Sequence, residues 1–321
     1  MLASIAKLYY ILPQFPILEI ELNSIFDKSL INLIVFLLYF EHLMINGLCR
    51  IHTQRYFMHQ LHNKNFIYTV TTGRSGSNFI KEVFACLPDT VSLHEPKPRY
   101  DRIMRAVQTH PHVARQFLIE KKLPSIEKVL GSKTNYFETS HLFAKGFLEH
   151  WLNIEDLPVP NLICLNRSHR DVSLSFTRLN SIPGRSINGL TYLLSPLDPN
   201  NLTSIKGLKS ASDEKYSDYQ FNYWYCLEME ARKKYYADLI QGKGGVAVNV
   251  SVKDLKVLSA FNDFCDQLHL PRLGFWGRKR FDKMTRTVVN AKSAKKRALD
   301  FSEEQLDKWE SEIKDNLVSR V

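Results

Sequence analysis

The feature that most constrains the fold is an apolar strand that runs into a glycine turn and then into a helix. The strand is expected over Phe66–Thr72, the turn reads Gly73-Arg-Ser-Gly-Ser-Asn78, and the helix is expected over Asn78–Cys86. Glycines let the backbone N–H groups of such a turn converge, and the helix N-terminus adds free donors and partial positive charge. This order therefore predicts a phosphate-binding loop.

The loop residues suit a dianionic group. Arg74 supplies a permanent cation, and the serines supply hydroxyl donors. No Lys-Ser/Thr pair follows the second glycine, as it would in nucleotide triphosphatases, which argues against an ATP or GTP enzyme. The candidate cofactor-binding residues of the loop are Gly73, Arg74, Ser75, Gly76, Ser77 and Asn78.

The rest of the chain alternates short apolar runs with longer helical stretches, which is typical of a parallel sheet with crossover helices. We expect an α/β fold with a doubly wound parallel sheet, flanking helices and a nucleotide-binding loop. A 30-residue segment, Pro183–Ser212, is expected to be a long loop, and a terminal helix is expected after a cap at Ser302. The further expected strands are Thr90–Leu93, Asn135–Glu138, Leu162–Leu165 and Val246–Val250, and the further helices are Asp101–Lys121, Asp171–Leu179, Tyr219–Ile240 and Lys256–Leu268.

The N-terminal residues differ in character from the remainder. Leu30–Phe40 is uncharged and apolar but is interrupted by Glu41 and His42, short of the roughly 20 apolar residues that span a bilayer. We expect residues 1–60 to form an apolar helical extension and 61–321 a single catalytic domain. The extension is compatible with a cytoplasmic protein peripheral to a membrane, or with a Golgi-type signal anchor.

Charge and cysteine usage narrow the partners. The formal net charge of +10 favours an anionic partner but does not choose among a nucleotide, a nucleic acid, an acidic glycan and a membrane surface. The five cysteines are far apart and form no CxxC pair, so we expect no metal site.

A second candidate phosphate site follows the expected strand at Leu162–Leu165. Arg167 at the carboxyl end of the strand offers a planar fork of donors, and Ser175 on the following helix can face the same anion. Asp171 is expected to cap that helix, and Arg170 is expected to be a cation in solvent.

These two stretches together resemble the sulfotransferases that use 3'-phosphoadenosine-5'-phosphosulfate (PAPS). Thr72-Gly-Arg-Ser-Gly-Ser-Asn78 is similar to the 5'-phosphosulfate loop of that family, and Arg167 with Ser175 is similar to its 3'-phosphate motif. Val250-Ser-Val-Lys-Asp-Leu255 resembles a late strand and turn of the family, with Lys253 where Glu is usual. The resemblance covers roughly Phe66–Pro271 and implies a PAPS co-substrate, no metal, and transfer of a sulfuryl group to an acceptor hydroxyl or amine.

Sulfuryl transfer to an alcohol needs a base, and three residues are candidates. Glu95 follows the second strand, in the place where a Glu looks like the base of the glycan and tyrosylprotein sulfotransferases. His141 resembles the histidine base of the cytosolic branch. His94 would point away from Glu95 if the strand continued past it. Arg74 is expected to stabilise the leaving nucleotide electrostatically; the candidate catalytic residues are thus Glu95, Arg74 and His141.

The acceptor and two other classes of function stay open. The position of Glu95 favours a carbohydrate or glycolipid acceptor, with possible contact to a membrane surface and no nucleic-acid partner. The alternatives are a small-molecule kinase or nucleotide hydrolase of the same fold, and a non-catalytic basic protein that binds glycans or nucleic acids.

Overall fold

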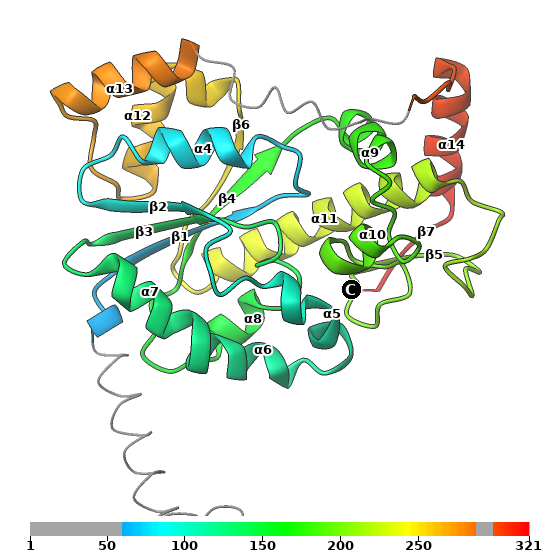
Figure 1. Cartoon of the computed structure of the whole chain (residues 1–321), viewed down its shortest axis with the longest axis horizontal. Helices are drawn as coiled ribbons and strands as arrows, with labels where there is room; N and C mark the ends of the chain where they lie inside the picture. Colours follow the sequence, from blue (N-terminus) through cyan, green and yellow to red (C-terminus); the bar gives the residue numbers. More distant parts are fainter. Residues whose placement is uncertain (1–59, 287–297, 321) are drawn as a thin grey trace, which may run out of the picture. The chain divides into compact units, whose positions relative to one another are not determined.

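The computed structural model describes residues 60–286 and 298–320 (Figure 1). The chain divides into two units, Met1–Tyr56 and Phe57–Val321, and every described residue belongs to the second. The expected N-terminal extension, including Leu30–Phe40, lies outside the described residues. Within the described part, no helix is both long and apolar enough to cross a bilayer.

The described part is built on a five-stranded parallel sheet in the order β2-β3-β1-β4-β6. The chain starts in the centre, moves to one edge, and returns past the first strand to build the other edge. The expected α/β fold with a parallel sheet is therefore confirmed. The strands are β1 (Asn65–Val70), β2 (Thr90–His94), β3 (Asn135–Thr139), β4 (Asn161–Asn166) and β6 (Ala247–Ser251).

Helices cover both faces of this sheet (Figure 1). One face packs against α4 (Ser77–Phe84), α12 (Leu258–Gln267) and α13 (Phe275–Arg286). The cluster of buried side chains on the other face includes residues of α5 (Asp101–Thr109), α6 (His112–Phe117), α7 (Leu123–Leu130), α8 (Leu148–Leu152), α9 (His169–Arg178) and α11 (Asp218–Gln241), and α14 (Glu303–Asp315) packs against α11.

Alternation along the central strands explains the two layers of core. Phe66 and Tyr68 of β1 enter the cluster that contains α11, whereas Ile67 enters the cluster that contains α4. Leu162 and Ile163 of β4 divide in the same way. Successive side chains of a strand point to opposite faces, so a strand buried on both sides reads as one continuous apolar run.

The expected helix Asp101–Lys121 is wrong as a single element. It is divided into α5 and α6, and a π-helical turn at Leu118–Lys122 then leads into α7. The break falls at His110, whose φ of −132° and ψ of 75° are not helical. Pro111 follows, and a proline disfavours the helical conformation of the residue before it.

The expected long loop Pro183–Ser212 is also wrong, because it contains α10 (Ile187–Tyr192) and β5 (Thr203–Ile205). β5 pairs antiparallel with β7 (Leu317–Ser319), a strand near the C-terminus that local pattern did not predict. The Arg185 guanidinium donates to the carbonyls of Ala211, Asp213 and Tyr216. The polar residues of Pro183–Ser212 therefore belong to a segment that hydrogen bonds hold in place.

Arg170 is not a cation in solvent, as its place in the sequence suggested. Its guanidinium contacts the carboxylates of Glu303, Asp307 and Glu310, all on α14. Glu310 also accepts a 2.5 Å hydrogen bond from the Tyr219 hydroxyl. These contacts attach the terminal helix, which begins after the expected Ser302 cap, to α9 and α11.

We predict that Arg170→Ala lowers the free energy of unfolding by about 1 to 2 kcal/mol, because the partly buried Glu310 loses its charged partner. Amide hydrogen exchange in α14 should accelerate more than exchange in β1. Arg178→Ala is the control, since Arg178 lies on the same helix and forms no ion pair within residues 60–286 and 298–320. Equal effects of the two changes would contradict the attachment of α14 through Arg170.

Candidate functional site

The turn after β1 has a left-handed backbone. Gly73, Arg74 and Gly76 have φ of 81°, 58° and 91°. Thr72 Oγ1 lies 2.9 Å from Ser75 Oγ, and the Tyr225 hydroxyl on α11 donates to the Thr72 carbonyl at 2.8 Å. The turn is therefore fixed by its own hydroxyls and by the long helix beneath it.

This turn delivers the chain directly into α4. Gly76 is the N-cap residue, and no side chain accepts from the first N–H groups of the helix. The first turn of α4 contains no acidic residue. A helix N-terminus of this kind offers backbone donors and partial positive charge to an anion.

Ser75 was expected to bind the cofactor through its hydroxyl, but its side chain points into the loop. Its side chain is buried, and its hydroxyl donates to the Gly73 carbonyl at 3.1 Å while meeting Thr72. It is absent from the cleft wall, which contains the loop residues on either side of it. The Ser75 hydroxyl thus shapes the loop, and Ser77 and Asn78 are the polar side chains that the loop presents to the cleft.

The structure brings the two predicted phosphate sites together. Arg167, just past the end of β4, donates from Nη1 to the carbonyl oxygen of Arg74. Arg74 Nε in turn donates to Ser175 Oγ on α9 at 3.2 Å. Both arginines therefore lie at the same edge of the sheet, where the carboxyl ends of β1 and β4 meet.

The helix that carries Ser175 begins differently from the expectation. Ser168 is its N-cap residue, and its hydroxyl accepts from the Asp171 N–H at 3.3 Å. Asp171 lies in the first turn, with a carboxylate oxygen 4.0 Å from Arg167 Nε. Its negative charge therefore lies beside Arg167, and Ser168 caps the helix in its place.

Two of the candidate bases meet across the same edge. Glu95 Oε1 lies 3.5 Å from His141 Nε2. Burial lowers the pKa of His141 well below its usual range, and Lys145 and His94 lower it further. His141 is therefore neutral near pH 7, and the contact joins a carboxylate to an uncharged imidazole.

His94 does not point away from Glu95, as an uninterrupted strand would require. β2 ends at His94, and Glu95 has a φ of 45°, which redirects the chain. His94 Nδ1 lies 2.8 Å from Thr139 Oγ1, and both His94 and Glu95 line the cleft.

These groups surround one cleft of about 430 Å³. That volume lies within the range of about 300 to 1,000 Å³ that is common for small-molecule sites. Loop residues and Arg167 form one part of the wall, and the candidate bases form another. The cleft is lined by Gly73, Arg74, Gly76, Ser77, Asn78, His94, Glu95, His141, Arg167, Phe176, Ser181, Tyr192 and Leu193.

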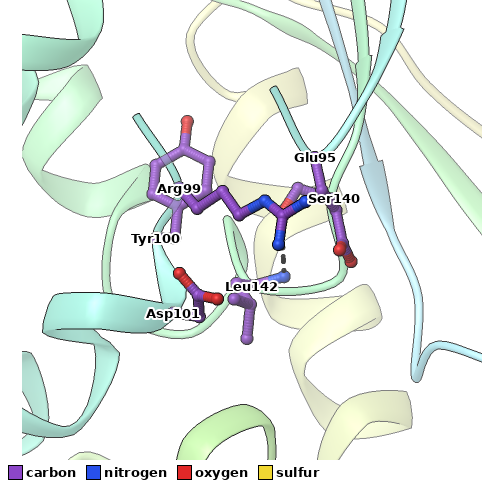
Figure 2. Close-up of a pocket in the computed structure, with 6 residues that line it drawn as sticks. All are labelled: Glu95, Arg99, Tyr100, Asp101, Ser140 and Leu142. Carbon is purple, nitrogen blue, oxygen red and sulfur yellow. Dashed lines mark hydrogen bonds between the residues drawn. The ribbon is translucent and has the colours of Figure 1, made fainter. Parts of the chain in front are cut away.

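A much smaller cavity of about 10 Å³ lies behind Glu95, with room for about one water molecule. Figure 2 shows the side chain of Arg99 extending towards Glu95 and Ser140 across this cavity. The Leu142 N–H donates to Ser140 Oγ at 3.3 Å and orders the turn after β3 that contains His141. Glu95 thus borders both the open cleft and this small cavity.

Sequence reasoning missed several residues of this site. Phe176 lies on α9, Ser181 follows that helix, and Tyr192 and Leu193 come from the segment expected to be a loop. Phe176, next to Ser175, is the one with a local signal in the sequence. Lys145 was also missed; it lies four residues after His141 in an apolar stretch, and its Nζ is 3.0 Å from His141 Nδ1.

The described residues contain no cluster of three or more His, Cys, Asp or Glu side chains that could share a metal ion. A scan of protein-family models found no match, and neither did a search of curated proteins. A solved structure that is similar is the sulfotransferase domain from the curacin biosynthetic pathway. It is 13% identical, with a TM-score of 0.46, and the match covers 70% of this chain and 81% of that chain. A function must therefore be argued from the residues of this chain.

We predict that Gly76→Ala lowers the free energy of unfolding by about 2 to 4 kcal/mol, from left-handed strain and overpacking. A Cβ at Gly76 would lie 2.4 Å from Val252 Cγ2. Chemical denaturation measures the change.

Gly274→Ala is the matched control, because a Cβ there meets nothing within 4 Å and its φ is not left-handed. Adding Val252→Ala to Gly76→Ala should recover the steric part of the loss but not the backbone strain. If Gly76→Ala were as stable as Gly274→Ala, the described loop conformation would be wrong.

Proposed function

We propose that this protein is a sulfotransferase that moves the sulfuryl group of PAPS to a hydroxyl of an acceptor. One observation carries the proposal: the phosphate loop, Arg167 and the Glu95–His141 pair line a single cleft, and Ser175 contacts Arg74 of that loop. The first two sets match the phosphate motifs of the PAPS-dependent family, and the third supplies a base.

In this proposal the donor spans the two anion sites. The 5'-phosphosulfate lies against the N-terminus of α4, where Ser77, Asn78 and the backbone N–H groups donate to it. The 3'-phosphate lies against Arg167 and Ser175. The existing contact between Arg74 and Ser175, 3.2 Å long, then gives way to contacts between these groups and phosphate oxygens.

The chemistry resembles phosphoryl transfer in what it requires of a protein. The acceptor oxygen forms a bond to sulfur while the bond between sulfur and the 5'-phosphate oxygen breaks. The acceptor proton passes to the base, and 3'-phosphoadenosine 5'-phosphate leaves with the electron pair. Arg74 stabilises the negative charge on that leaving group but cannot act as an acid, since its guanidinium stays protonated.

Glu95 is the base in this proposal. It leaves the sheet at the carboxyl end of β2, and its carboxylate borders the cleft beside His141. His141 remains the alternative base. Its lowered pKa leaves the imidazole uncharged near pH 7, with a nitrogen lone pair that can accept a proton.

The acceptor is proposed to be a carbohydrate or a glycolipid. Phe176 and Tyr192 line the cleft near the base and provide aromatic surface of the kind against which a sugar ring packs. A glycolipid would place the reaction at a membrane surface, in keeping with the apolar residues that precede the catalytic unit.

We predict that 3'-phosphoadenosine 5'-phosphate raises the melting temperature by several degrees, since ligand at 100 times its Kd adds about 2.7 kcal/mol of stability. ATP with magnesium should produce a much smaller shift. Arg167→Ala should weaken binding about 10- to 100-fold, because it removes charge-assisted hydrogen bonds.

Arg272→Ala is the control for that substitution. Arg272 is exposed and pairs with Asp266, outside the cleft, so its loss should leave the nucleotide affinity unchanged. A larger shift with ATP than with the bisphosphate would overturn the proposal in favour of a kinase or hydrolase.

We predict that Glu95→Gln lowers kcat by about 10²- to 10⁴-fold while the affinity for 3'-phosphoadenosine 5'-phosphate changes little, because the amide cannot take the acceptor proton. The assay is transfer of labelled sulfate from PAPS to a panel of glycans. Full activity of Glu95→Gln together with loss in His141→Gln would assign the base to His141.

A further inference from the structure

Lys145 is an ionisable side chain buried beside the cleft whose place no phosphate motif explains. Lys145 is fully buried, in the turn after β3. Its Nζ lies 3.0 Å from His141 Nδ1 and donates to the Tyr192 carbonyl at 2.5 Å. It also lies 4.9 Å from the centre of the Tyr225 ring. Burying an amine costs free energy unless it is hydrogen-bonded, and Lys145 is bonded in two directions.

The surroundings of Lys145 disfavour its charge. Burial lowers its pKa well below the usual range, Arg232 and Arg105 lower it further, and Glu95 and Asp198 oppose them. An anionic donor bound in the adjacent cleft would act in the same direction as Glu95 and Asp198 and raise the pKa of Lys145.

The two neighbours of His141 are arranged to select one form of its ring. On one side, the Glu95 carboxylate faces Nε2 and can only accept a hydrogen bond. On the other side, the Lys145 amine faces Nδ1. The amine carries enough hydrogens to donate to both Nδ1 and the Tyr192 carbonyl, whether it is charged or neutral. Both sides thus favour a ring with its proton on Nε2.

We propose that Lys145 is a positioning residue that holds His141 in the tautomer protonated at Nε2, so that His141 donates to Glu95 and Glu95 serves as the base. This inference rests on the proposed function for its catalytic meaning. His141 Nδ1, occupied by the Lys145 hydrogen bond, cannot take a proton from the acceptor. One Glu95 oxygen is held by the ring, and the other is left for the acceptor hydroxyl.

In this arrangement Glu95 and His141, which the sequence left as alternative bases, have different roles. His141 orients the carboxylate, Glu95 accepts the proton, and Lys145 fixes the ring between them. The hydrogen bond from Lys145 to the Tyr192 carbonyl also ties this chain of groups to α10, beside the acceptor end of the cleft.

The test is nitrogen NMR of the histidine side chains in the full-length protein labelled with ¹⁵N-histidine, with the His141 signals identified by their loss in His141→Gln. We expect a protonated Nε2 and an unprotonated Nδ1 in the wild type at neutral pH. Lys145→Met, which keeps the length of the side chain but removes its donor, should shift the Nδ1 signal and populate the other tautomer.

The matched control is Lys233→Met, which removes another buried lysine whose Nζ contacts Asn166 and Glu230 and which does not line the cleft. It should leave the His141 signals unchanged. A wild-type ring protonated at Nδ1 would overturn the proposal, as would unchanged His141 signals in Lys145→Met. If Lys145→Met fails to fold, a wild-type ring protonated at Nδ1 still overturns the proposal.

Kinetics separate this inference from the proposed function. Lys145→Met should lower kcat for sulfuryl transfer about 100-fold, as expected for a misplaced catalytic group, with little change in KM for PAPS. An inactive wild type would contradict the sulfotransferase assignment, while the NMR result would still decide the tautomer.

Discussion

The organisation of the site depends on the left-handed turn that follows the central strand. Gly73, Arg74 and Gly76 all have positive φ, and this path directs the chain from β1 into the N-terminus of α4. Glycine adopts such a conformation without steric cost, whereas Arg74 does so at a cost that the surrounding hydrogen bonds must offset. The hydrogen bond from the Tyr225 hydroxyl on α11 to the Thr72 carbonyl supplies part of that support.

The parallel sheet then brings distant residues to one edge. β1, β2 and β4 are all parallel, so their carboxyl ends lie together and the residues that follow them share a cleft. Glu95 follows β2 and Arg167 follows β4. Because the chain crosses from one side of β1 to the other, the turn after β1 lies between Glu95 and Arg167.

The remaining wall of the cleft is held by the C-terminal part of the chain. β7 pairs with β5, and Arg170 binds α14. Buried Glu228 accepts from the N–H of Thr203 and from Arg232, which also donates to the Asn200 carbonyl. The segment that carries Tyr192 and Leu193 into the cleft is thus attached to α11 and to the end of the chain.

The sequence by itself determined the class of fold, the glycine turn after the first strand and the position of Arg167 after a later strand, because each depends on local pattern. An apolar run buried on both faces, glycines at a turn, and an Arg after a strand are all visible within a few residues. Only the tertiary structure decided that Ser75 faces inward, that Arg170 binds α14, and that Lys145 contacts His141. Those outcomes depend on which side chains meet after the chain has folded. The spacing of two residues along the sequence does not give the distance between their side chains in space.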